Sequence, residues 1–201
     1  MHDVLRLSAE DLVAVFKTIE APGLEEMEGE FAALLLRQPD LAAALSGHLT
    51  CYNPLYPGMW LAKAFRPVGE GRGRGYNTSK HFGRVVQRFP MVTLVAPSRY
   101  DDGPAFQLVY RAFHSYCGFI HMVDEVRRLE AGQYLGIGTA GFSDAQRRVP
   151  RPFLLTGPVA PYRGDIGQGR AGFKVESEVP ALSGSRYIRR LRPRDRRPCC
   201  S

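Results

Sequence analysis

The sequence lacks any long apolar run: among its 201 residues, the short stretch 31–36 is typical of the longest ones. A membrane-spanning helix needs about 20 mainly apolar residues, so no membrane span is expected. The start of the chain carries Asp3, Glu10 and Asp11, which a secretory signal would not contain. We therefore expect a soluble, cytoplasmic protein of one domain.

Cysteine is also scarce. Cys51 and Cys117 are isolated, Cys199 and Cys200 are adjacent, and no C-x-x-C spacing occurs. The histidines include no H-x-x-x-H pair. Structural zinc and similar metals usually need such closely spaced ligands, so no metal site is expected. The cysteine pattern indicates reduced thiols in a reducing compartment rather than a disulfide framework.

Two common catalytic signatures are missing. No G-x-S-x-G elbow is present, so a serine hydrolase of that type is not supported. The loop 69–75 has glycines spaced as in phosphate-binding loops, but residues 76–80 do not open the apolar helix that a dinucleotide site requires. We interpret this loop as a hairpin or lid, with anion contact by Arg72 and Arg74 as the alternative, and we expect no cofactor.

The net charge of +7 is concentrated near the end of the chain. Residues 185–198 contain seven arginines and one aspartate, which account for six of the seven charges. The remainder is nearly neutral and gives no strong nucleic-acid signal. Residues 163–201 are rich in Gly, Ser, Pro and Arg, and we interpret them as a basic, poorly ordered tail. Contact with nucleic acid or an anionic membrane is the alternative for this tail.

The residues 1–50 are predicted to form a helical segment. Ser8 is a suitable N-cap with Asp11 three residues later, and apolar residues follow at helical spacing. A second helix is predicted over 24–38, and a short helical turn over 41–45. The apolar side of the second helix consists of Met27, Phe31, Leu34 and Leu35.

Beyond residue 53 the apolar period changes from helical to roughly two, and turn residues recur at short intervals. This pattern is typical of an antiparallel meander or barrel. The expected fold is mainly β, with an antiparallel up-and-down barrel over 51–162 between the helical segment and the tail. The predicted strands are 59–65, 75–82, 84–88, 91–96, 105–113, 119–129 and 133–142, with 152–156 as an eighth.

The triplet G-M-W at 58–60 opens the first of these strands and contains the single tryptophan of the chain, Trp60. It resembles the G-x-W signature at the start of the barrel in lipocalins and other calycins. The chain is also similar to bacterial uncharacterised proteins with a G-x-W-x-G motif, although Ala62 stands at the second glycine. The resemblance implies a calycin-like barrel in which Trp60 closes one end and Arg151 or Arg163 stacks over it.

The segment 105–129 carries the most informative side chains. Two predicted strands flank residues 114–117, and a turn centred there sets which residues face each other. One face then combines aromatic bulk with an imidazole and a carboxylate, which is typical of a pocket lining. A slip of one residue would exchange the faces. The predicted pairs are Tyr110 with His121, Leu108 with Val123 and Phe106 with Glu125 on that face, and Gln107 with Asp124 on the other.

Candidate site residues follow from this register. His121 has three interpretations: a buried histidine bonded to a neighbouring hydroxyl, a ligand-binding residue, or an acid–base catalyst. In the catalytic interpretation, Tyr110 and Glu125 are its partners. Glu125 and Arg127 lie two residues apart on one strand face, which suits an ion pair. The predicted pocket lining is Trp60, Tyr76, Phe106, Leu108, Tyr110, His121, Val123, Glu125 and Tyr134, with room left by Ala62, Ala64, Gly136 and Gly138.

These observations favour binding of a small apolar or aromatic molecule inside the barrel, since a barrel of about eight strands can hold one small ligand. The alternative is a cofactor-independent enzyme, an isomerase, lyase or cyclase, that uses acid–base residues in the same cavity. A third interpretation is an interaction protein that uses the helical segment and the tail. A homodimer is compatible with the sequence.

Overall fold

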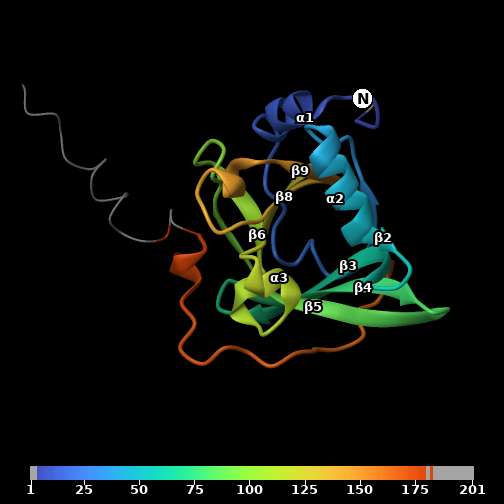
Figure 1. Ribbon diagram of the computed structural model, residues 1–201. Coiled ribbons are helices and arrows are strands. Elements are labelled where there is room, and N and C mark those ends of the chain that lie inside the picture. The colour runs from blue at the N-terminus through green and yellow to red at the C-terminus, as the bar shows by residue number, and fades with distance from the viewer. Residues whose placement is uncertain (1–3, 180–181, 183–201) are drawn as a thin grey trace, which may run out of the picture.

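The computed structural model, which describes residues 4–179 and 182, is a closed antiparallel barrel of eight strands (Figure 1). The strands follow one another around the barrel in chain order, and β1 closes it by pairing with both β9 and β3. A short strand, β2 (Tyr52–Asn53), extends the pairing of β3. The barrel strands are β1 (Gly29–Leu35), β3 (Gly58–Gly69), β4 (Arg72–His81), β5 (Arg84–Pro97), β6 (Pro104–Val109), β7 (Val123–Glu130), β8 (Gln133–Thr139) and β9 (Arg151–Ala160).

Helices are short and lie outside the strands. In Figure 1, α1 lies above the barrel and α2 runs along its right side. None of the helices within residues 4–179 is both long enough and apolar enough to cross a membrane. Their bounds, with those of the 3-10 turns, are α1 (Ala9–Phe16), α2 (Leu41–Cys51), α3 (Tyr116–Phe119), η1 (Tyr110–Ala112), η2 (Gln146–Arg148) and η3 (Val175–Ser177).

The predicted capping of the first helix is confirmed. The Asp11 amide donates to Ser8 Oγ at 3.1 Å, and the Ser8 amide donates to Asp11 Oδ2 at 3.3 Å. These bonds satisfy amides that the first helical turn leaves without partners. Leu12 and Phe16 are fully buried in a cluster with the outward side chains of β8. The apolar side of α1 therefore anchors this helix to the outer surface of the barrel.

The predicted helix over 24–38 is wrong, because this segment contains β1. Gly29 has φ +113°, a conformation that an α-helix cannot contain. Beyond it the side chains alternate: Phe31 is buried and Leu34 is 45% exposed. Hydrogen-bonded ladders on both sides, to β3 and to β9, fix this extended conformation. The barrel thus begins before residue 51, and the helical segment 1–50 includes one barrel strand.

Three further elements differ from the predictions. The turn expected over 41–45 is the longer helix α2, which Asp40 caps by accepting from the Ala43 amide at 2.7 Å. The strands expected at 84–88 and 91–96 form one continuous strand, β5. This strand contains a bulge at which Phe89 and Pro90 lie opposite Tyr76 of β4. The strands expected to meet near 114–117 stop short, since η1 and α3 occupy the connection.

The first part of the predicted tail packs against the barrel. Asp165 forms an ion pair with Arg66 at 2.9 Å, and Val175 and Val179 are buried against residues of β5 and β6. Figure 1 shows this segment running along the outside of the strands. Residues 163–179 are therefore an ordered strap on the barrel, whereas the arginine-rich segment 185–198 and the cysteines at 199 and 200 lie outside the described residues.

A buried arginine joins α1 to the barrel. Arg127, expected to pair with Glu125, instead forms two bonds of 2.7 Å with Asp101 and donates to the Phe16 carbonyl at 2.8 Å. These hydrogen bonds from Arg127 lower the pKa of Asp101. A carboxyl whose pKa is lowered by folding stabilises the protein above its unfolded pKa, near pH 4, and loses this contribution as the pH falls through its folded pKa.

We expect Asp101→Asn to lower the free energy of unfolding at pH 7 by about 2 kcal/mol, because it leaves the Arg127 guanidinium without its anion. The difference from the wild type should shrink as the pH falls below about 4, where the wild-type carboxyl also becomes protonated. Urea unfolding at several pH values measures this difference. The exposed Asp144 provides the control Asp144→Asn, which should change little. A difference of equal size at pH 3 and pH 7 would contradict the role of the ion pair.

Candidate functional site

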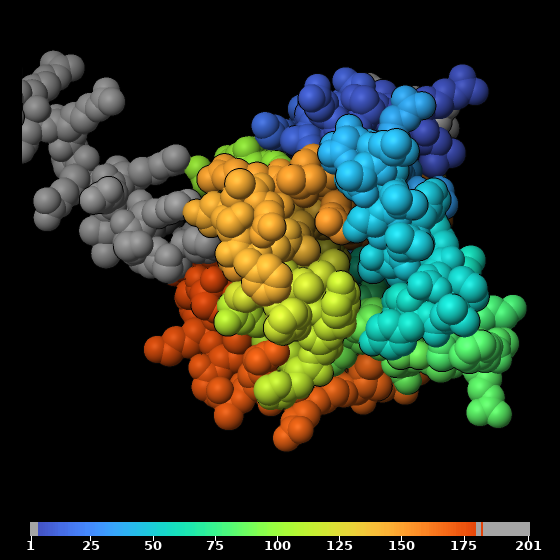
Figure 2. All heavy atoms as spheres, in the orientation of Figure 1, coloured from blue at the N-terminus to red at the C-terminus, as the bar shows by residue number. Residues whose placement is uncertain are grey.

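A pocket opens at one end of the barrel, between α2 and α3. The space between its walls is about 690 Å³ when the open solvent at its mouth is counted, and the centre of a water-sized molecule can occupy about 90 Å³ of it. Figure 2 shows the corresponding hollow between the light-blue α2, the yellow-green α3 and the orange residues that precede β9. The walls are mainly apolar, with Leu35, Trp60, Phe89, Met122 and Phe153 among the residues that line it.

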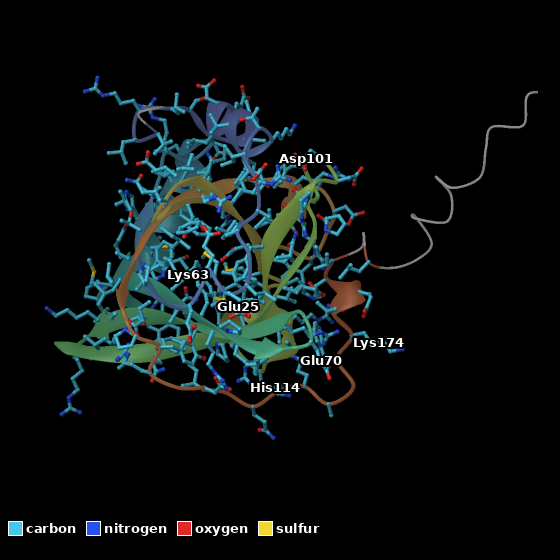
Figure 3. The ribbon with its side chains drawn as sticks, turned by 180° about the vertical axis from the view of Figure 1, so that it is seen from behind. Glu25, Lys63, Glu70, Asp101, His114 and Lys174 are labelled. Carbon is cyan, nitrogen blue, oxygen red and sulfur yellow. The ribbon has the colours of Figure 1, made fainter. Side chains whose placement is uncertain are left out.

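Lys63 of β3 lies at the centre of a buried polar cluster in the pocket wall, and Figure 3 shows it inside the ring of strands. Its Nζ donates to Asn77 Oδ1 at 3.0 Å, to the Tyr110 hydroxyl at 2.5 Å and to Asp124 Oδ2 at 2.8 Å. The side chains of Lys63 and Asp124 are only 5% and 3% exposed. All three ammonium protons therefore have acceptors within the protein.

Aromatic rings enclose this ammonium group. The Lys63 Nζ lies 5.1 Å from the ring centroids of Trp60 and Phe153, and 5.2 Å from that of Tyr110. Such cation–π contacts are strongest where water is excluded. The Trp60 indole also donates to Asn77 Oδ1 at 3.1 Å. The tryptophan expected to close one end of the barrel thus lines the pocket and contacts its polar cluster.

The polar cluster is hydrogen-bonded on its other sides as well. The Tyr110 hydroxyl donates to Asp124 Oδ2 at 2.9 Å and accepts from Asn77 Nδ2 at 3.2 Å. Gly138 faces Asp124 on the neighbouring strand, where an added Cβ would stand 2.8 Å from Asp124 Oδ1. The glycine therefore leaves space for the Asp124 carboxylate, which occupies the position beside it.

Three titratable groups of the pocket, the Tyr110 hydroxyl and the thiols of Cys51 and Cys117, have raised pKa values. Desolvation raises the pKa of the Tyr110 hydroxyl well above its usual value and that of the Cys51 thiol to about 11. Desolvation also raises the pKa of the fully buried Cys117 thiol. At neutral pH the phenol and both thiols are protonated, so the charges of the lining come from lysine, aspartate and arginine side chains.

Two polar side chains of the lining have unused hydrogen-bonding capacity. Gln38 is 9% exposed, and its Nε2 donates to the carbonyls of Leu36 at 2.8 Å and Pro152 at 3.0 Å. These acceptors fix the orientation of the amide, and its Oε1 is buried without a partner. Arg151, the first residue of β9, forms no ion pair with any of the residues that the structure describes.

The register predicted for β6 and β7 is wrong by one residue. Phe106 faces Val126 and Leu108 faces Asp124, whereas Val109 faces Val123. The long connection through η1 and α3 replaces the expected tight turn, and the inward face of β7 changes accordingly. Asp124 is therefore in the pocket lining, whereas Val123 and Glu125 point outward.

His121 and Glu125 lie in separate polar clusters away from the pocket. His121 Nδ1 lies 2.8 Å from an Arg147 nitrogen and 3.0 Å from a carboxylate oxygen of the buried Glu178. The Glu125 carboxylate accepts from the Ser98 hydroxyl and, at 3.0 Å, from the Arg99 amide. Burial raises the pKa of Glu125. Neither side chain contacts Tyr110, so the structure does not bring the three predicted catalytic residues together.

The remaining predicted lining residues divide between three locations. Trp60 and Tyr110 line the pocket, while Phe106, Leu108 and Tyr134 belong to the buried interior cluster. Tyr76 is on the outer face of β4, where its hydroxyl donates to Glu30 at 2.9 Å, because Asn77 and Ser79 occupy the inner face.

The alanines and glycines that were predicted to leave space inside the barrel lie in different positions. Ala62 and Ala64 point outward because Lys63 and Phe65 point inward, so their predicted contribution to interior room is wrong. The space beside Gly136 is filled by the Phe153 ring, with which an added Cβ would clash.

The cation stacked over Trp60 is Lys63 rather than the arginine that the resemblance implies. Arg163 instead lies over the Tyr76 ring at 6.0 Å and pairs with Glu30 at 2.6 Å. Arg151 does line the same pocket as Trp60. Within residues 4–179 and 182, no three His, Cys, Asp or Glu side chains are grouped so that they could hold a metal ion.

Comparisons with known proteins do not assign the chain to a family. No protein-family profile matches the chain, and no curated protein matches it. Among solved structures, the crystal structure of a protein from Thermomonospora curvata is similar over 75% of this chain and 87% of its own, with 12% identity and a TM-score of 0.48.

Proposed function

We propose that this protein binds a small apolar or aromatic molecule in the pocket at the end of the barrel. The observation that carries this proposal is an open pocket whose walls are mainly apolar and aromatic, with a few fixed polar groups. Binding sites for small molecules have this composition.

The alternative, proton-transfer catalysis in a cofactor-independent isomerase, lyase or cyclase, has less support from the geometry. An acid–base group needs a proton or lone pair available to the substrate. All three protons of the Lys63 ammonium are donated within the protein, and the Tyr110 hydroxyl already donates to Asp124. These contacts favour a structural cluster that shapes the wall of a binding pocket.

Binding can be tested with N-phenyl-1-naphthylamine, a neutral aromatic probe that fluoresces in apolar surroundings. Trp60 is the only tryptophan, so energy transfer from it reports a bound probe, and a substitution at Cys51 in the pocket lining shows whether the probe is bound there. We expect the wild type to bind the probe with quenching of tryptophan fluorescence. The variant Cys51→Phe should weaken binding at least tenfold, because the larger side chain extends from α2 into the pocket.

Leu49→Phe is the matched control, since Leu49 is on the same helix but 58% exposed and outside the lining. It should leave probe affinity unchanged. Circular dichroism of both variants establishes that the barrel is intact. Absence of probe binding, or equal binding by the wild type and Cys51→Phe, would contradict the proposed site.

A further inference from the structure

The charges in the pocket lining do not cancel. Lys63 and Asp124 form an ion pair at 2.8 Å, so their charges offset each other. The thiols of Cys51 and Cys117 and the hydroxyl of Tyr110 are protonated at neutral pH, as described above. Arg151 remains, and it carries the one positive charge of the lining that no anion within the described residues offsets. An occupant with a single negative charge would neutralise the site.

Arg151 is well placed to meet such a charge. It is the first residue of β9 and faces Gly138 across the ladder with β8, so no side chain stands between it and the pocket on that strand. Phe153, two residues further along the same face, contributes an aromatic wall. A guanidinium presents parallel N–H donors that fit the two oxygens of a carboxylate. The ring and the guanidinium together complement a molecule with an apolar body and one carboxylate.

A second observation indicates that the pocket is built for a ligand. Gln38 is nine-tenths buried in the same lining, and the two carbonyls that bind its Nε2 prevent the amide from turning over. Its Oε1 therefore remains a buried acceptor without a donor. Buried polar atoms in native proteins are nearly always hydrogen-bonded, to protein, water or a ligand. A ligand that brings an N–H or O–H would satisfy this oxygen.

We propose that the natural ligand is a small apolar or aromatic carboxylate that also carries an N–H or O–H donor, with its anionic group bound by Arg151 and its donor by Gln38 Oε1. This inference rests on the proposed function and adds the chemical class of the ligand. It is separate from the Lys63 cluster, whose donors are already used. Arg151 thus selects the anionic group of the ligand and Gln38 its donor, while the apolar walls bind its body.

The test compares 2-naphthoate with its neutral methyl ester by isothermal titration calorimetry. We expect the wild type to bind the carboxylate at least tenfold more tightly than the ester in low salt, with the preference reduced by added salt. Arg151→Gln should lose this preference while it still binds N-phenyl-1-naphthylamine as the wild type does. Arg151→Lys should keep part of the preference, because it retains the charge but not the paired donors.

Arg148→Gln is the matched control, because Arg148 is an exposed arginine in η2 just before β9 and is outside the lining. This variant should keep the full preference for the carboxylate. If the wild type binds the neutral probe but treats the acid and the ester alike, or if Arg151→Gln keeps the preference, the proposed ligand class is wrong and the pocket remains a binding site. If neither the neutral probe nor either naphthalene compound binds, the proposed function itself fails.

Discussion

Replacement of Lys63 by methionine is expected to lower the free energy of unfolding by about 3–5 kcal/mol, the cost of leaving one member of a buried ion pair without its partner. Methionine fills most of the space of the lysine stem, so the loss does not come from a cavity. It comes from the Asp124 carboxylate, which would keep only the Tyr110 hydroxyl as a donor in a wall that excludes water. Urea unfolding at pH 7 measures the change.

The double variant Lys63→Met with Asp124→Leu separates the cost of an unpaired charge from the value of the pair. Because taking two charges out of water offsets most of their attraction, the double variant should be much more stable than Lys63→Met alone. Lys80→Met, on the exposed side of β4, is the control and should change stability by less than about 0.5 kcal/mol. A cost for Lys63→Met as small as that of the control would show that water reaches Asp124.

The barrel could be predicted because its signals are local. Alternating apolar residues and frequent turn residues define strands without knowledge of their partners, and seven of the eight barrel strands lie within the region predicted to be β. The first strand was missed because its apolar residues satisfy two periods. Phe31 and Leu35 are four apart and fit one helical face, but they also lie in phase on an alternating strand with Ala33 between them.

The pocket was predicted less well because its composition depends on register. Of the predicted aromatic lining residues, Tyr110 and Trp60 line the pocket, whereas Tyr76 lies on the outer face of β4. A tight turn before β7 would place Asp124 on the opposite face, but the connection through η1 and α3 shifts the pairing by one residue. No local pattern reports how a short helix such as α3 adjusts that register.

Lys63 was missed for a related reason. The β3–β4 pairing shifts between Trp60 and Ala62, so Trp60 and Lys63 line the same pocket although they are three residues apart. In a regular strand, residues three apart point to opposite faces. A lysine in a strand is also more commonly solvated than buried. Its role depends on Asn77 of β4, Tyr110 of η1 and Asp124 of β7, which only the closed barrel brings together.

The strand character of β1 has a direct experimental consequence at two positions that the helical pattern would bury together. Phe31 is fully buried, with its ring centroid 5.8 Å from that of Phe65 and 5.5 Å from that of Tyr134. Phe31→Ala should lower the free energy of unfolding by about 3–5 kcal/mol, because it removes a large side chain from a packed interior. Leu34→Ala on the same strand should cost less than about 1 kcal/mol, because that side chain points outward and is 45% exposed. Urea unfolding of both variants measures the contrast, and comparable losses would mean that both side chains are buried, as a helix over 24–38 requires.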